Sequence, residues 1–199
     1  MSEPEFLWAR VAQEKLVVPL LKRVLGNVEI ESKDLQSPDW DYEGMDKLVR
    51  KKDGGSFIMA VRSRTWSYHT RTPRDVTLRI TNRSGAATEI HKLNARYYFY
   101  GITDSDSLKT MPESFVWWVI WHIAPFRERY DGYGKPLPEF PVKTAPSSGD
   151  TFIPIPIDWL QNEGYLVALK RPNEEIVKFS PYWGLIGTPI TIVRLDNFT

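Results

Sequence analysis

Two neighbouring stretches of the chain carry residue types that could perform metal-assisted chemistry on a phosphodiester. Asp46 opens the run "DKLVRKK", and Arg62 follows the apolar run "FIMAV" on the other side of the turn "DGG". Hydrolysis with Mg²⁺ needs carboxylate oxygens held close together, and a neighbouring cation stabilises the charge of the transition state. Two strands joined by a tight turn can supply this set, with an Asp on the first strand and an acid–x–Lys group on the second. Here Ala60 and Arg62 stand at the latter positions, so one carboxylate is absent.

Strand geometry predicts where these side chains point. Alternation along a strand over 56–64 places Ala60 and Arg62 on one face and Val61 on the other. A carboxylate at position 60 would therefore have pointed the same way as Arg62. Arg keeps the positive charge of Lys, but it does not lose its proton and it makes a wider, planar contact.

The first half of the chain predicts, in order, a helix, an edge strand, a hairpin, a third strand, a short helix and an aromatic strand. The ranges are 5–25, 27–32, 45–52 with 56–64, 75–81, 85–94 and 95–103. Apolar residues recur at helical spacing in the first of these. Pro19 should kink or split that helix, and Gly26 should end it. The turn "DGG" between two apolar runs predicts the hairpin.

The second half is aromatic and rich in turns. The segment 113–130, "ESFVWWVIWHIAPFRERY", fits either a strand followed by a short helix or one buried helix. A Pro/Gly-rich loop is expected at 131–150, then a strand and a helix from "TFIPIPIDWLQNEG", with Asp158 near the start of the helix. Two β-rich pieces, around 165–170 and 190–195, close the chain. This order predicts an α/β (α+β) fold with a mixed central β-sheet flanked by helices.

Composition limits the classes of function. The 199 residues contain no Cys, which excludes disulfides, thiolate metal sites and a Cys nucleophile and fits a reducing cytosol. The start "MSEPEFLWAR" lacks the features of a signal peptide, and the longest apolar stretch is shorter than the roughly 20 residues that span a bilayer. We therefore expect a cytoplasmic protein that does not associate with membranes. His69, His91 and His122 show no metal-binding spacing, and no Walker, GxSxG or GxGxxG motif occurs.

Positive charge is concentrated between residues 61 and 96. The acidic residues there are Asp75 and Glu89, whereas the basic residues are Arg62, Arg64, Arg71, Arg74, Arg79, Arg83, Lys92 and Arg96. An excess of Arg suits phosphate oxygens, because guanidinium groups form paired hydrogen bonds with them and binding releases counterions. A solvated face of strands and turns is the alternative.

Aromatic residues are interleaved with Arg in the loop that follows residue 64. Trp66 and Tyr68 lie between Arg64 and Arg71, an arrangement that suits base stacking combined with phosphate contacts. Together with Arg74 and Arg79, these residues form the predicted nucleic-acid-binding set. The other aromatic residues, such as Tyr97, Phe99 and Trp118, are expected to pack in the core.

The segments "PDWDYEGMD", "IMAVRSR" and "ARYYFYG", with a helix before them and a strand and helix between the last two, resemble the PD-(D/E)XK nuclease superfamily. The resemblance covers roughly residues 5–102. It implies a restriction-endonuclease-like core with a β-rich C-terminal extension. Asp46 matches the family's Asp, because "GMD" resembles the Gly–hydrophobic–Asp form, with Asp39 of the literal "PD" as the rival. Glu14 would match the helical Glu that often precedes the hairpin.

Two departures from the family pattern bear on activity. Ala60 stands where the family has an acidic residue or Gln, and Arg62 stands where it has Lys. Some members take their second acid from the next helix, so the resemblance implies Glu89 as a replacement. In that case Asp46 and Glu89 would hold Mg²⁺ and Arg62 would stabilise the pentavalent phosphate. Purely structural roles remain as alternatives: a turn cap, a helix-terminal carboxylate or an exposed surface residue.

Three functions are consistent with the sequence. The first is a nucleic-acid-binding protein of nuclease-like fold, with DNA as the favoured partner and metal-dependent hydrolysis impaired or lost. The second is an active Mg²⁺-dependent endonuclease. The third is a protein-interaction or inhibitor domain of viral or mobile-element origin that uses the C-terminal half. The chain could also form a homodimer. The expected domain organisation is a core over 1–130, the loop 131–150 and an extension over 151–199 packed on the same domain.

Overall fold

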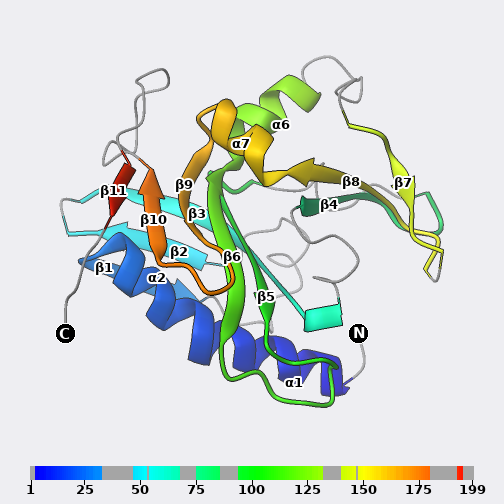
Figure 1. The fold of residues 1–199 in the computed structure, drawn as a ribbon, viewed down its shortest axis with the longest axis horizontal. Helices are drawn as coiled ribbons and strands as arrows, with labels where there is room; N and C mark the ends of the chain where they lie inside the picture. The colour runs from blue at the N-terminus through cyan, green and yellow to red at the C-terminus, as the bar shows by residue number, and fades with distance from the viewer. Residues whose placement is uncertain are drawn as a thin grey trace.

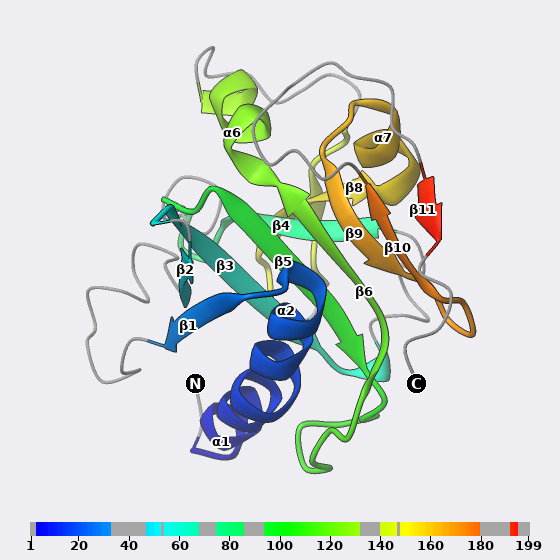
Figure 2. The same cartoon turned by 90° about the vertical axis from the view of Figure 1, so that its left-hand side faces the viewer.

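The structure is a computed structural model that describes residues 3–32, 47–52, 54–67, 75–85, 94–131, 140–146, 148–179 and 192–194. These residues form two β-sheets and a few helices. Within these ranges the main sheet has the strand order β1-β2-β3-β5-β6-β9-β10-β11, and the second sheet has the order β4-β8-β7 (Figure 1). The helical segment α1–α2 lies on one face of the main sheet, and β4 and β8 lie behind the other face (Figure 2). The predicted α+β class and mixed sheet are confirmed.

The strands of the main sheet are β1 (Val28–Ser32), β2 (Lys47–Lys51), β3 (Ser56–Arg64), β5 (Tyr97–Thr103), β6 (Phe115–His122), β9 (Leu166–Lys170), β10 (Ile176–Phe179) and β11 (Ile192–Arg194). Those of the second sheet are β4 (Asp75–Thr81), β7 (Lys143–Thr144) and β8 (Thr151–Pro156). The helices are α1 (Glu3–Val11), the π-helical η1 (Ala12–Val17), α2 (Val18–Leu25), α6 (Ile123–Asp131) and α7 (Ile157–Asn162).

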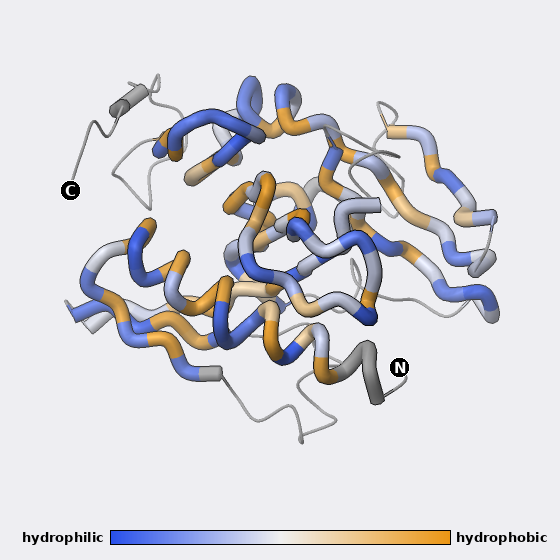
Figure 3. Tube along the Cα trace, turned by 60° about the horizontal axis from the view of Figure 1, so that its bottom comes forward, coloured by the Kyte–Doolittle hydropathy of each residue, from blue (hydrophilic) through white to orange (hydrophobic). Residues whose placement is uncertain are grey.

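The N-terminal helix is continuous but changes its hydrogen-bonding pattern before Pro19. The π-helical turn η1 ends at Val17, and Pro19 occupies the first turn of α2, where its missing N–H costs least. The helix ends at Gly26, whose positive φ of 78° suits glycine. Hydrophobic and hydrophilic residues alternate along this segment (Figure 3), and Val17 and Leu21 are fully buried against the main sheet. The predicted split at Pro19 is absent, because Val17 and Val18 keep right-handed helical backbone angles and only the hydrogen-bonding pattern changes.

The hairpin predicted around "DGG" is confirmed. β2 pairs antiparallel with β3, and β3 pairs in parallel with β5, which places the aromatic strand beside the strand that carries Arg62. β1 lies at the edge of the main sheet, as expected. Within the segment 113–130 the strand β6 is followed by the helix α6, which is the first of the two predicted alternatives.

The third predicted strand, β4, does not join the main sheet. All seven residues of β5 are buried, whereas β4 leaves Asp75 and Arg79 partly exposed, so β5 is the strand suited to the position beside β3. β4 pairs instead with β8, whose Pro154 and Pro156 lie beyond the end of its pairing with β7. A proline donates no hydrogen bond and is tolerated where one side of a strand has no partner.

The C-terminal half extends the main sheet beyond β6. β9 pairs with β6, and β10 pairs with both β9 and β11. The two expected β-rich pieces correspond to β9 and β11, whereas β10 and the short β7 were not predicted. Strands from residues 151–179 therefore lie in both sheets beside strands from residues before 130.

Gly101 in β5 lies in a tightly packed part of the core. A Cβ atom at this position would lie 2.7 Å from two ring carbons of Phe115 and 2.9 Å from one of Phe99. Both rings are buried and pack edge to face with centroids 5.2 Å apart. The sheet therefore has no room for a larger residue at this position.

We expect Gly101→Ala to lower the free energy of unfolding by about 1–3 kcal/mol, because overpacking forces buried side chains to move. Urea denaturation followed by tryptophan fluorescence measures the change. Combining Gly101→Ala with Phe115→Leu should recover part of the loss, since the smaller side chain relieves the contact. Strictly additive effects of the two substitutions would contradict this packing.

Candidate functional site

The β2–β3 hairpin positions the candidate chemistry. Lys47, which follows Asp46, pairs with Met59, which precedes Ala60. Ala60 is buried in the core between the two sheets, whereas Val61 is buried on the helix-covered face. The predicted alternation of the second strand is therefore confirmed. Asp46 itself lies outside the described residues.

Arg62 and Arg64 lie on the same strand at the end of β3, and both are half-buried. Arg62 pairs in register with Tyr100, whose hydroxyl is 3.2 Å from the Thr77 hydroxyl on β4. Burial raises the pKa of Tyr100, while the charge of Arg64, the hydrogen bond with Thr77 and the charge of Arg62 oppose this rise. The phenol thus stays protonated at neutral pH, and two guanidinium groups approach it where the sheets meet.

Tyr100 and Thr77 were not predicted as members of this site. Tyr100 belongs to an aromatic run that was expected to be core, and it is indeed fully buried. Its polar hydroxyl was the available signal, because a buried tyrosine usually needs a hydrogen-bond partner. The parallel pairing of β3 with β5, which a sequence pattern does not specify, brings it to Arg62.

The end of β3 is fixed by backbone contacts. The Thr103 hydroxyl donates to the Arg64 carbonyl at 3.1 Å, and the Trp66 amide donates to the Ser105 carbonyl at 2.6 Å. The Trp66 side chain packs, partly buried, against the core between the sheets. Trp66 therefore does not lie freely in a polar loop as predicted.

The remaining members of the predicted nucleic-acid-binding set fall into two groups. Arg79 forms an ion pair with Asp150, with 3.4 Å between Nε and Oδ2, which offsets its charge. Tyr68, Arg71 and Arg74 lie outside the described residues.

Glu14 lies apart from Arg62. Its Oε1 atom is 3.3 Å from Nζ of Lys47, a side chain that is only 1% exposed. Lys47 pairs with Met59 and therefore points to the helix-covered face, opposite the face of Ala60 and Arg62. The structure does not bring Glu14 and Arg62 together, and it gives Glu14 a role in compensating a buried ammonium group.

We expect Glu14→Gln to lower the free energy of unfolding by about 1–3 kcal/mol, because the buried ammonium group of Lys47 loses a charged partner. Nucleic-acid affinity should stay unchanged. Urea denaturation and fluorescence anisotropy measure the two quantities, and Glu29→Gln on the edge strand serves as a matched control. Loss of affinity at unchanged stability would restore Glu14 as a site residue.

A magnesium site is not assembled by the residues that the structure describes. In this part of the chain no three His, Asp or Glu side chains converge as metal ligands. Ala60 offers no side-chain oxygen as a ligand. The predicted ligands Asp46 and Glu89 both lie outside the described ranges, so the described residues alone do not fit the ion.

His122 is a packed residue beside the aromatic strand. Its ring stacks on Tyr97 with 4.9 Å between centroids, and its backbone amide donates to the Tyr165 carbonyl at 2.8 Å. Burial lowers the pKa of His122 below its ordinary value of 6.5, the charge of Arg96 lowers it further, and Glu128 opposes the shift. His69 and His91 lie outside the described residues.

The folded state therefore favours the neutral His122 imidazole, so the unfolded state binds more protons just below pH 6.5. Stability should fall as the pH drops from about 6.5 through the lowered pKa. We expect His122→Phe, which keeps an aromatic ring against Tyr97, to reduce the loss of stability between pH 7 and pH 5. Urea midpoints at the two pH values test this, and equal pH dependence in both proteins would contradict it.

Comparison with known proteins gave no match: no family model, no curated protein and no solved structure is significantly similar to this chain. Among the helices in the described ranges, none has the length and apolarity needed to cross a membrane.

Proposed function

We propose that the chain binds nucleic acid, with DNA as the favoured partner, on a nuclease-like core whose metal-dependent hydrolysis is impaired or lost. The observation that carries the proposal is the pair Arg62 and Arg64 on one strand, beside Tyr100, at the point where the chain enters the Arg-rich segment 65–74. Guanidinium groups in such an arrangement suit phosphate oxygens.

The order of elements supports a nuclease-like core. A helix precedes the antiparallel hairpin β2–β3, and β5 returns parallel to β3. The residue after Asp46 and the residue before Ala60 are cross-strand partners, which agrees with a site built on this hairpin. The additional strand β4 and the strands β9–β11 are elaborations on that core.

Ala60 is the reason to propose binding without efficient cleavage. It is buried, and it replaces a metal ligand of the family pattern with a methyl group. Arg62 carries a fixed positive charge that can neutralise a phosphate but cannot serve as a proton acceptor. The alternative of an active endonuclease requires Asp46 and Glu89 to supply the metal ligands together.

We expect Arg62→Ala and Arg64→Ala each to weaken binding of a labelled DNA oligonucleotide several-fold. Each substitution should also reduce the slope of log affinity against log salt by about 1, because one phosphate contact is lost. Fluorescence anisotropy between 50 and 200 mM salt measures both, a range over which phosphate contacts weaken strongly. Arg50→Ala is the matched control, since Arg50 is exposed and paired with Glu31 at 2.9 Å.

Unfolding curves of the variants show whether weaker binding comes from a lost phosphate contact or from a destabilised fold. Arg62→Lys keeps the positive charge and should retain most of the salt dependence of binding. A cleavage time course on supercoiled plasmid with Mg²⁺ or Mn²⁺, run beside Asp46→Ala, separates the two nucleic-acid functions. No metal-dependent cleavage is expected. Cleavage that disappears in Asp46→Ala would establish the active endonuclease, and absence of both binding and cleavage would exclude a nucleic-acid function.

A further inference from the structure

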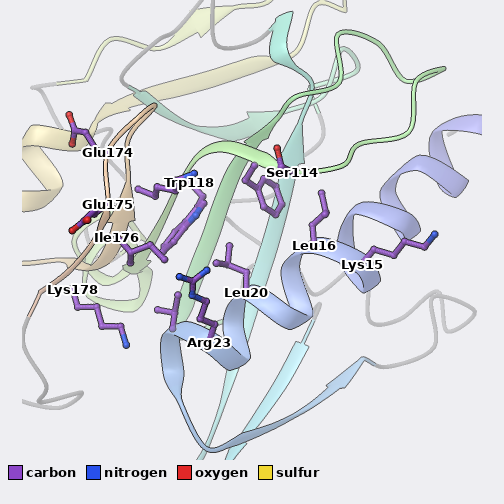
Figure 4. A pocket seen from close by; sticks show the side chains of 13 residues that line it. Lys15, Leu16, Leu20, Arg23, Ser114, Trp118, Glu174, Glu175, Ile176 and Lys178 are labelled. Atoms are coloured by element: carbon purple, nitrogen blue, oxygen red, sulfur yellow. The ribbon is translucent and has the colours of Figure 1, made fainter. Parts of the chain in front are cut away.

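A groove opens on the helix-covered face of the main sheet, between the N-terminal helix and the β9–β10 hairpin (Figure 4). Its volume is about 500 Å³. Part of its surface is apolar and is formed by Leu16, Leu20, Phe115, Trp118 and Ile176. Phe115 and Trp118 are buried, whereas Leu16, Leu20 and Ile176 are only partly buried. Three separate parts of the chain thus present apolar side chains to one space.

Cationic side chains surround this apolar surface. Arg23 comes from α2, Lys170 from the end of β9 and Lys178 from β10. Figure 4 shows Arg23 rising from the helix towards the side of the groove formed by Ile176 and Trp118, whereas Lys15 extends away along the helix. Burial lowers the pKa of Lys178, as expected for an ammonium group that has lost part of its water.

These cations have no carboxylate partner within 4 Å among the described residues, unlike Arg50, Arg79 and Arg171. Two carboxylates, Glu174 and Glu175, also line the groove, but Glu174 lies 4.0 Å from Arg171. Positive charge therefore exceeds negative charge around an apolar surface. A cation that is partly desolvated without a counter-charge is stabilised when an anion binds next to it.

We propose that this groove binds a small organic anion with an apolar body, such as an acyl or aryl chain that ends in a carboxylate, sulfonate or phosphate. Arg23 and Lys178 bind the anionic group. Leu16, Leu20 and Ile176 contact the apolar body over Trp118. The volume lies within the range of small-molecule sites, about 300–1,000 Å³.

This site is separate from the proposed nucleic-acid surface. Trp118 and Phe115 belong to the core on the helix-covered face, whereas Ala60 and Tyr100, beside Arg62 and Arg64, belong to the core between the sheets. The two proposals can therefore fail independently.

The test compares two fluorescent probes of the same aromatic skeleton, the anionic 8-anilinonaphthalene-1-sulfonate and the neutral N-phenyl-1-naphthylamine. We expect the folded protein to bind the anionic probe about tenfold more tightly, an amount typical of one charge-assisted contact. The double variant Arg23→Ala/Lys178→Ala should lose that preference, while Lys22→Ala, an exposed lysine of α2 that does not line the groove, should keep it. Dodecanoate should displace the bound probe, and dodecanol should displace it less well.

Several results would overturn the proposal. Equal binding of the two probes, or an unchanged preference in the double variant, would mean that the charges have no role. If a single-stranded oligonucleotide displaced the sulfonate probe as well as dodecanoate does, the groove would be assigned to nucleic acid instead. A stoichiometry that falls as protein concentration rises, with dimers seen in sedimentation, would assign it to a second copy of the chain. Unfolding curves of the double variant show whether its fold is intact.

Discussion

The central pair of strands, β5 and β6, must be covered on both faces, and the rest of the architecture follows from this requirement. All seven residues of β5 are buried, as are most of β6. Tyr98, Tyr100 and Trp121 point towards the second sheet, whereas Phe99 and Trp118 point towards the N-terminal helix. Each large side chain contributes about 1.5–3 kcal/mol when it leaves water. Removing either the second sheet or the N-terminal helix would therefore expose several of these large side chains to water.

The two covers place polar side chains in different surroundings. On the helix-covered face, Lys47 is buried and Glu14 compensates its charge from η1. On the other face, Arg62 and Arg64 approach the buried hydroxyl of Tyr100, which also contacts Thr77 of β4. Alternate residues of the β2–β3 hairpin face opposite sides of the sheet. The ion pair of Lys47 with Glu14 therefore lies on one side, and Arg62 and Arg64, which we propose bind phosphate, lie on the other.

The groove lies where the main sheet extends sideways beyond the helix that covers it. The main sheet continues beyond β6 through β9 and β10, and the N-terminal helix ends at Leu25. The space left between the helix and the β9–β10 hairpin keeps Leu20 and Ile176 partly exposed, with Arg23 and Lys178 beside them. This combination of cations with an apolar floor is the feature on which the proposed anion site rests.

Local patterns in the sequence determined the elements, because hydrophobic spacing and turn chemistry act over a few residues. Gly26 marked the end of the helix, "DGG" marked the hairpin, and alternation put Ala60 and Arg62 on one face, whereas the helix continues past Pro19. The sequence did not determine that β5 rather than β4 lies beside β3, because strand pairing depends on which surfaces are buried by distant segments. That choice brought Tyr100 to Arg62 and left β4 in the second sheet, where Arg79 pairs with Asp150. The groove could not be predicted either, since Arg23 and Lys178 are separated by most of the chain and line one groove only when the sheet and its helix pack together.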